Sequence, residues 1–121
     1  MSENLQNKFK VALIQMQSQP DIRQNFESAN AFLSNAIEEH RAKMIVFPGN
    51  FLGLGIENYT ARFDDFQFYI QKFQEIAREK HVSLVLGSIP FPAGERSKKC
   101  FSRSLLIDEF GELACFYDKV P

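Results

Sequence analysis

The stretch that most constrains the fold runs from Met44 to Phe51 and reads Met-Ile-Val-Phe-Pro-Gly-Asn-Phe. Four apolar residues follow one another without interruption, and Pro48, Gly49 and Asn50 then end the run. Such a run predicts a strand that is buried on both faces of a sheet. In open α/β sheets the chemistry lies just beyond such strand ends, so a catalytic side chain is expected after Pro48. The residue there is glycine, and this missing side chain governs the functional interpretation.

Strands and helices alternate along the rest of the chain. Phe9–Met16 is apolar through its middle, which predicts a first strand inside the sheet rather than at its edge. Apolar residues at helical spacing predict a helix over Ile22–His40, with Asp21 as its N-cap. A strand, a helix and a second strand in this order form a crossover that leaves the two strands parallel. The later segments predict a loop at Phe51–Arg62, a helix from Asp64 to His81, and strands at Val82–Ile89, Phe101–Ile107 and Leu113–Tyr117.

The last two strands are expected to form an antiparallel hairpin around Glu109-Phe110-Gly111, with the glycine at a position that needs positive φ. The sequence therefore predicts an α/β fold with a mixed sheet of about five strands and two helices. With 121 residues and 45% hydrophobic content, the chain is expected to form one domain over 9–121, preceded by a flexible N-terminus at 1–8.

The net charge of the chain limits the kinds of partner it is expected to bind. A net charge of −1 argues against nucleic-acid and membrane surfaces, because those partners require a concentrated basic face. A short basic cluster, formed by Arg96, Lys98, Lys99 and Arg103, is interpreted as a solvated loop, with anion contact as the alternative. Because the N-terminus is polar, without the apolar core of a signal peptide, we expect a cytoplasmic protein. Cys100 and Cys115 are accordingly expected to be reduced, buried thiols.

Several segments, taken in chain order, carry a resemblance to a known family. They are Val11–Met16, Asn25, Ile45–Pro48, Gly87–Ile89, Leu106–Asp108 with Gly111, and Tyr117–Val120. Together they resemble the N-terminal half of the nitrilase superfamily of carbon–nitrogen hydrolases, and they are most similar to the nitrilase-like ω-amidases and deaminated-glutathione amidases. The resemblance implies part of an αββα sandwich, in which two sheets pack face to face between outer helices. One face of the sheet predicted here would then lack its covering sheet.

The resemblance also implies a chemistry. In such amidases a cysteine thiolate attacks the amide carbon, a glutamate acts as general base, and a lysine stabilises the oxyanion, all on adjoining strand ends. Carried over to this sequence, Lys119 matches the lysine and Gly49 occupies the position of the glutamate. The nucleophilic cysteine belongs to a later strand that this sequence does not contain. No cofactor is implied, and no metal-ligand spacing is present.

Other residues are candidate substitutes for the missing groups. Glu57, Asp64 and Asp65 follow Gly49 and are weak alternatives for the base, because a base must lie within hydrogen-bond reach of its proton. His40 and His81 lie at predicted helix ends, where a cation suits the helix dipole, and neither has a nucleophile beside it in the sequence.

The sequence thus predicts a truncated nitrilase-like amidase that is inactive as a single chain. The alternative is a non-catalytic association module. In either case the chain is expected to form a homo-oligomer or to pair with a second nitrilase-like chain, because an uncovered apolar sheet face favours association. A small amide is expected as a substrate only if a second chain supplies the missing half.

Overall fold

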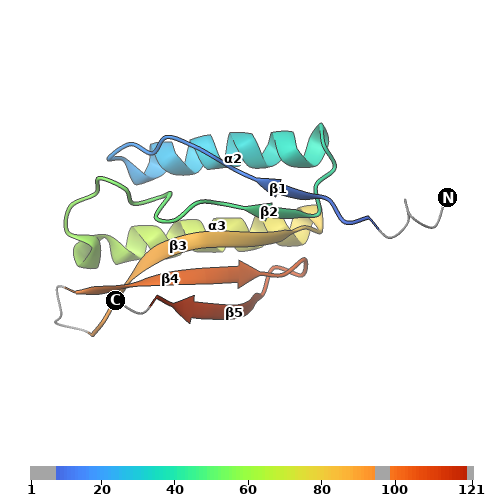
Figure 1. The fold of residues 1–121 in the computed structure, drawn as a ribbon. Helices are drawn as coiled ribbons and strands as arrows, with labels where there is room; N and C mark the ends of the chain where they lie inside the picture. Colours follow the sequence, from blue (N-terminus) through green and yellow to red (C-terminus); the bar gives the residue numbers. More distant parts are fainter. Residues whose placement is uncertain (1–7, 95–98, 120–121) are drawn as a thin grey trace.

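The computed structural model describes residues 8–94 and 99–119, and the predicted flexible N-terminus lies outside this part up to residue 7. Arg96 and Lys98 of the basic cluster also lie outside it. Within the described part the elements follow the predicted order (Figure 1). They are β1 (Val11–Leu13), α2 (Ile22–Glu38), β2 (Met44–Val46), the 3-10 helix η1 (Tyr59–Arg62), α3 (Phe63–Lys80), β3 (Ser83–Pro92), β4 (Cys100–Ile107) and β5 (Leu113–Asp118).

The described strands form one sheet of five strands in the order β1-β2-β3-β4-β5. The strands β1, β2 and β3 are parallel, whereas β3, β4 and β5 pair antiparallel. This arrangement confirms the predicted α/β fold with a mixed sheet and a C-terminal hairpin. Gly111 in the hairpin connection has φ of +83°, as the sequence predicted.

The prediction for the first strand was wrong in one respect. The strand β1 lies at an edge of the described sheet, not inside it, and only Val11–Leu13 pairs with β2 as strand. The exposed fraction is 45% for Val11 and 76% for Leu13, whereas the intervening Ala12 packs against the core. An apolar run has the same composition whether one or both of its faces are covered, so the sequence could not distinguish these cases.

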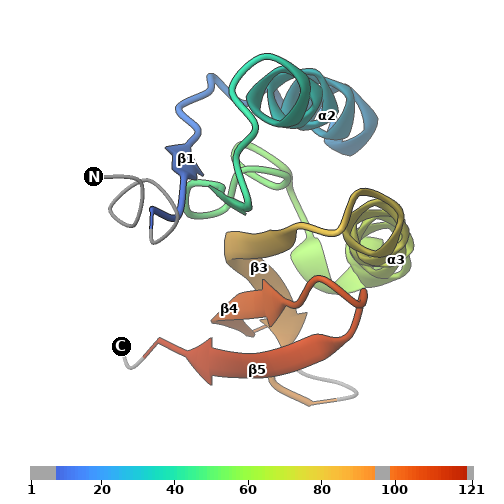
Figure 2. The same cartoon turned by 90° about the vertical axis from the view of Figure 1, so that its right-hand side faces the viewer.

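Both helices pack on the same face of the sheet, as the end-on view in Figure 2 shows. Their buried stripes meet Ile45 of β2 and Leu84 and Leu86 of β3, which are fully buried. Phenylalanine rings fill the space between the layers. Phe47 stacks on Phe51 with ring centroids 4.8 Å apart, and Phe73 from α3 lies 5.4 Å from Phe47. The core is therefore one layer thick, between the sheet and its helices.

The helix ends follow the local sequence. The carboxylate of Asp21 accepts a hydrogen bond from the Gln24 N–H at 3.2 Å, which satisfies one of the amides that the first turn of α2 leaves unpaired. His81 adopts a left-handed conformation with φ of +55° and ends α3 as its C-cap. His40 follows the end of α2 by two residues. Both histidines are thus at helix ends.

The opposite face of the sheet is bare in the described part of the chain. Strand pairing aligns residues that share a face, and one row runs across all the described strands. The row comprises Leu13, Val46, Val85, Leu106 and Cys115. We call this side the open face, because no described helix or strand covers it (Figure 2). In residues 8–94 and 99–119 no helix is long and apolar enough to cross a membrane.

Candidate functional site

Position 49 lies just past the end of β2, where the sequence predicted the chemistry. The chain is fixed there by backbone contacts with β3: the Phe47 N–H donates to the Val85 carbonyl at 2.9 Å. The Asn50 N–H donates to Ser88 at both its hydroxyl oxygen, 2.7 Å away, and its carbonyl, 3.1 Å away. Gly49 sits between these anchors and is exposed. A side chain at this position would therefore project from a well-held backbone.

Nothing in the local backbone requires glycine at position 49. The positive-φ glycines of the described part are Gly55 and Gly111, so Gly49 adopts a conformation open to other residues. A Cβ atom built on Gly49 would lie 3.3 Å from the Ser88 hydroxyl oxygen, a tight contact with a side chain and with no backbone atom of the described residues within 4 Å outside the neighbouring residues. A larger residue at position 49 therefore requires a shift of the Ser88 hydroxyl by a few tenths of an ångström, not of the backbone.

Gly87 on the neighbouring strand is a different case. A Cβ atom built there would lie 2.3 Å from the Phe47 carbonyl oxygen and 2.4 Å from the Pro48 carbonyl carbon. These are backbone atoms that cannot rotate away, so only glycine lets β3 approach the end of β2 this closely. The ladder between β3 and β4 is irregular at the same point, between Leu86 and Ile89. Gly87 therefore positions the segment that carries Gly49.

Lys119 follows the last residue of β5 and is exposed. Its N–H donates to the Ser102 carbonyl at 2.9 Å, which extends the hairpin ladder by one residue. Because β4 is antiparallel to both β3 and β5, β5 runs parallel to β2, and the two strands end at the same edge of the sheet (Figure 1).

The expectation that the two strand ends adjoin was wrong. The strands β3 and β4 lie between β2 and β5, because the hairpin extends the sheet outward from β3. The structure therefore places Gly49 and Lys119 at the same end of the sheet, with two strands between them.

A cavity of about 160 Å3 lies beside position 49. Its lining residues are Asn50, Tyr59, Pro90, Cys100, Phe101 and Ser102. The Asn50 amide nitrogen donates to the Tyr59 hydroxyl at 3.3 Å, and the Cys100 sulfur lies 3.8 Å from the Thr60 hydroxyl. No carboxylate or imidazole of the described residues lines this cavity, so it offers a thiol without a base to activate it.

The alternative carboxylates lie elsewhere. Asp65 is paired with Arg62 at 2.8 Å within α3 and η1. Asp64 lines a separate cavity of about 450 Å3 between the start of α3 and the ends of β3 and β4. Glu57 is exposed in the loop before η1. None of these three lines the cavity beside Gly49.

The prediction that both thiols are buried was wrong for Cys115. Cys115 is exposed and Cys100 is half-buried. Cys115 lies on the edge strand β5, where its side chain points to the open face, and no described element covers it there. Neither cysteine is in a disulfide.

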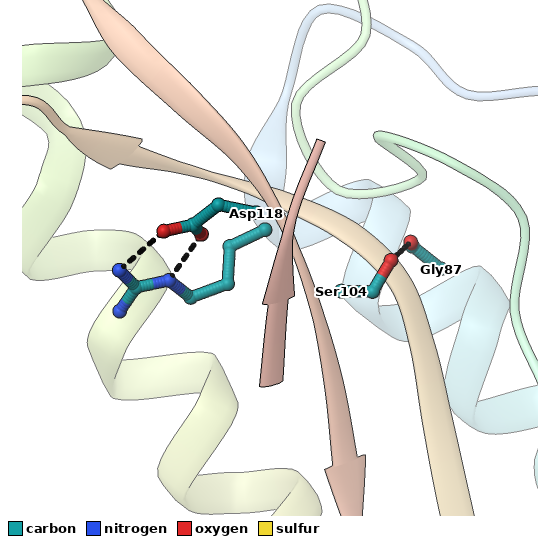
Figure 3. A network of polar contacts seen from close by, with 4 residues as sticks. Gly87, Ser104 and Asp118 are labelled. Carbon is teal, nitrogen blue, oxygen red and sulfur yellow. Dashed lines mark hydrogen bonds and ion pairs between the residues drawn. The ribbon is translucent and has the colours of Figure 1, made fainter. Parts of the chain in front are cut away.

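Sequence reasoning missed an ion pair that anchors the Lys119 segment. Arg103 donates to the two oxygens of the Asp118 carboxylate at 2.7 and 3.0 Å (Figure 3). Its guanidinium group also stacks over Phe91 and Phe116, at 4.5 and 4.2 Å from the ring centroids. The hydrogen bonds from Arg103 hold the pKa of Asp118 below its ordinary value. Arg103 is thus a structural cation on β4, whereas the sequence placed it at the border of a solvated loop.

A second polar contact holds β3 against β4 near Gly87. The Ser104 hydroxyl donates to the Gly87 carbonyl at 2.5 Å (Figure 3). The predicted hairpin could have placed Arg103 opposite Asp118 only if the register of its two strands were known. The register is shifted by a β-bulge or irregularity between Leu106 and Ile107, which the sequence does not reveal.

The chain is similar to known proteins along nearly its whole length. The model of the carbon–nitrogen hydrolase family matches residues 10–121. The nitrilase and fragile histidine triad fusion protein NitFhit of Caenorhabditis elegans is 27% identical over 115 residues, which is 91% of this chain and 26% of that protein. Its crystal structure superposes with a TM-score of 0.83 at 24% identity, covering 92% of this chain and 27% of that chain.

A bacterial amidase gives a second comparison. The crystal structure of an amidase from Nesterenkonia sp. superposes with a TM-score of 0.76 at 24% identity and covers 93% of this chain and 43% of that one. A mutant of the amidase from Nesterenkonia sp. AN1 in complex with butyramide gives a TM-score of 0.73, also at 24% identity. This chain therefore spans between about a quarter and under half of the length of these relatives.

Proposed function

Because this chain belongs to the carbon–nitrogen hydrolase family, whose model matches residues 10–121, we propose that it forms an amidase-type layer without a general base. Gly49 carries the proposal. By resemblance to nitrilase-like amidases, the residue after Pro48 removes the proton from the thiol, and glycine has no group that can do so. Loss of a general base costs about 10²–10⁴-fold in rate.

Lys119 is assigned as the oxyanion-stabilising residue of this layer. A lysine ammonium group positioned at the developing charge stabilises a tetrahedral intermediate only if it is held in place beforehand. The hydrogen bond from the Lys119 N–H to Ser102 and the ion pair of the adjacent Asp118 support such positioning of the backbone. A lysine cation gives no acyl transfer when both the general base and an activated thiol are absent. We therefore expect this chain to be inactive by itself.

The test is release of ammonia from butyramide, the amide bound by the Nesterenkonia mutant, with the intact Nesterenkonia amidase as positive control. The purified chain is expected to release no ammonia above the buffer rate. Steady release that stops after thiol alkylation would overturn the proposal, because it would require a base and a nucleophile within this chain.

A second candidate function, association without catalysis, is favoured by the open face. A row of five uncharged residues crosses this face, with Leu13 and Cys115 exposed, and apolar residues exposed together mark interaction surfaces. In this role the chain pairs with a second nitrilase-like chain or with its own copy. Sedimentation velocity together with binding of a hydrophobic dye tests the role: a monomer at every concentration that binds no dye would contradict it.

A further inference from the structure

We propose that Ser18 and Asn25 are positioning residues, which hold the chain just past position 49 and so set where a side chain at that position lies. The inference rests on the proposed function, because it concerns the position to which the general base is assigned by resemblance. Each contact that carries it joins two described residues, so it does not depend on what covers the open face.

The loop that follows β1 and the loop that follows β2 lie side by side. The two strands are parallel and paired, so both loops begin at the same end of the sheet (Figure 1). The Ser18 hydroxyl, in the first loop, donates to the Phe51 carbonyl in the second at 2.6 Å. A Cβ atom built on Gly55 would lie 3.6–3.9 Å from three atoms of Pro20, so the loops approach each other closely there as well. The loop after β1 thus supports the segment that follows position 49.

Asn25, near the start of α2, makes the more deeply buried contact. It is 1% exposed, and its amide nitrogen donates to the Leu52 carbonyl at 2.8 Å and to the Gln19 carbonyl at 2.7 Å. Its side-chain oxygen accepts from the Gln19 N–H at 2.6 Å. Both amide hydrogens and the oxygen are therefore satisfied, which removes most of the cost of burying a polar side chain. Loss of the amide would leave the buried Leu52 carbonyl without this donor.

The backbone of Asn50 shows why contacts from outside the segment are needed. Asn50 has φ of +50°, in the left-handed region that asparagine tolerates better than most residues but still disfavours. Its side-chain oxygen is also buried without a hydrogen-bond partner among the described residues. Such a conformation persists where the surrounding structure fixes it. Ser88 does so on one side, by accepting from the Asn50 N–H at 2.7 Å, and Ser18 and Asn25 do so on the other.

Position 49 lies between these two sets of contacts. A general base acts only within hydrogen-bond reach of its proton, and a displacement of about 1 Å can cost about 10²-fold in rate. Ser18 and Asn25 contact the backbone two and three residues beyond position 49 and bear no group that would touch a reacting atom. Their role is therefore to fix where residue 49 lies, whichever side chain it carries.

The experiment is amide hydrogen exchange of the full chain, followed residue by residue by NMR. The reporters are the N–H groups of Asn50 and Leu54, the second of which donates to the Asn50 carbonyl at 3.0 Å. The reference is the set of amides around Leu84 in β3, a strand that is paired on both sides. Ser18→Ala should lower the protection of the reporters about two- to tenfold relative to the reference, as expected for one lost hydrogen bond. Ser18→Thr keeps the hydroxyl and should restore the protection, and Asn25→Ala should lower it by about tenfold or more.

The matched control is Leu33→Ala, which truncates another fully buried residue of α2, about two turns further along the helix. Lost core packing acts on opening of the whole domain, so this variant should lower the protection of the reference amides at least as much as that of the reporters. Equal losses at reporter and reference amides, or no loss at the reporters, would overturn the role of the residue that was changed. Ser18 is only half-buried, so its variants decide the matter even where Asn25→Ala prevents folding. Ammonia release from butyramide is measured separately, so the positioning and the absence of a base can each fail alone.

Discussion

Two glycines near the end of β2 should respond in opposite ways to the same substitution. In Gly87→Ala the new methyl group would lie 2.3 Å from the Phe47 carbonyl oxygen and 2.4 Å from two atoms of Pro48. Relief requires β3 to move away from the end of β2 by about 1 Å, since ordinary carbon contacts are about 3.5 Å or longer. That movement weakens the Phe47–Val85 and Asn50–Ser88 backbone hydrogen bonds, which now measure 2.9 and 3.1 Å.

The magnitude follows from these losses. Two weakened hydrogen bonds cost about 0.5–1.5 kcal/mol each. Forced overpacking adds about 1–3 kcal/mol. The lower entropy of the unfolded alanine chain offsets about 0.4–1 kcal/mol. The free energy of unfolding should therefore fall by about 1–5.5 kcal/mol, up to a large share of the 5–15 kcal/mol that is typical of a domain.

Gly49→Ala is the matched control, because its methyl group meets only the Ser88 hydroxyl at 3.3 Å. Its free energy of unfolding should change by less than about 1 kcal/mol, because the lower entropy of the unfolded chain offsets the tight contact. Urea denaturation measures both variants; at an m-value of about 2 kcal/mol/M, a loss of about 1–5.5 kcal/mol in Gly87→Ala appears as a fall in midpoint of roughly 0.5–3 M. A loss below about 1 kcal/mol in Gly87→Ala, or equal losses in both variants, would refute the claim that only Gly87 is required by packing.

Two further predictions concern the elements around the site. The pKa of Asp118 is lowered by its hydrogen bonds from Arg103, so its contribution to stability is present above the unfolded pKa and is lost as pH falls through the folded value. The melting temperature of the wild-type chain should thus fall as pH drops below about 4. Asp118→Asn should have a lower melting temperature at pH 7 and should lack that part of the pH dependence. Identical pH profiles for the two proteins would disprove the coupling. Asp21→Ala removes the N-cap contact to the Gln24 N–H and should lower the free energy of unfolding by about 1 kcal/mol, measured by urea denaturation, with Asp21→Asn retaining most of the stability.

The order of the elements could be predicted from the sequence because each depends on local patterns. The apolar run before Pro48, the helical spacing after Asp21 and the glycine of the hairpin each reflect a constraint within a few residues. The structure confirms the strands and helices that these patterns indicate, and it confirms the positive φ at Gly111.

The errors concern what covers a strand, which depends on residues far apart in the sequence. The edge position of β1 depends on which strands pair with it, and the exposure of Cys115 depends on which face of the sheet the helices cover; composition alone specifies neither. The Arg103–Asp118 pair depends on the hairpin register, which an irregular ladder shifts. Gly49 and Lys119 are separated because the β4–β5 hairpin pairs with β3 on the side away from β2.

The place of Gly49 in the fold could be predicted from the sequence, whereas the roles assigned to Gly49 and Lys119 remain predictions. Gly49 lies after β2 as expected, because the Pro48 turn ends the strand at that point. What the sequence did not indicate is that position 49 is exposed and has no positive φ, and that a Cβ atom there would meet only the Ser88 hydroxyl, at 3.3 Å. This geometry makes the proposed role of position 49 testable by substitution.

The most direct test of the central claim is the activity of a chimera in which this chain replaces the matching segment of the Nesterenkonia amidase. Ammonia release from butyramide would be compared between the chimera with Gly49 and its Gly49→Glu variant, with Gly49→Gln as the control for size. The account predicts that only Gly49→Glu raises kcat/KM, by about 10²-fold or more. Equal activity with Gly49 and with Gly49→Glu would contradict it, because position 49 would then not be the place of the base.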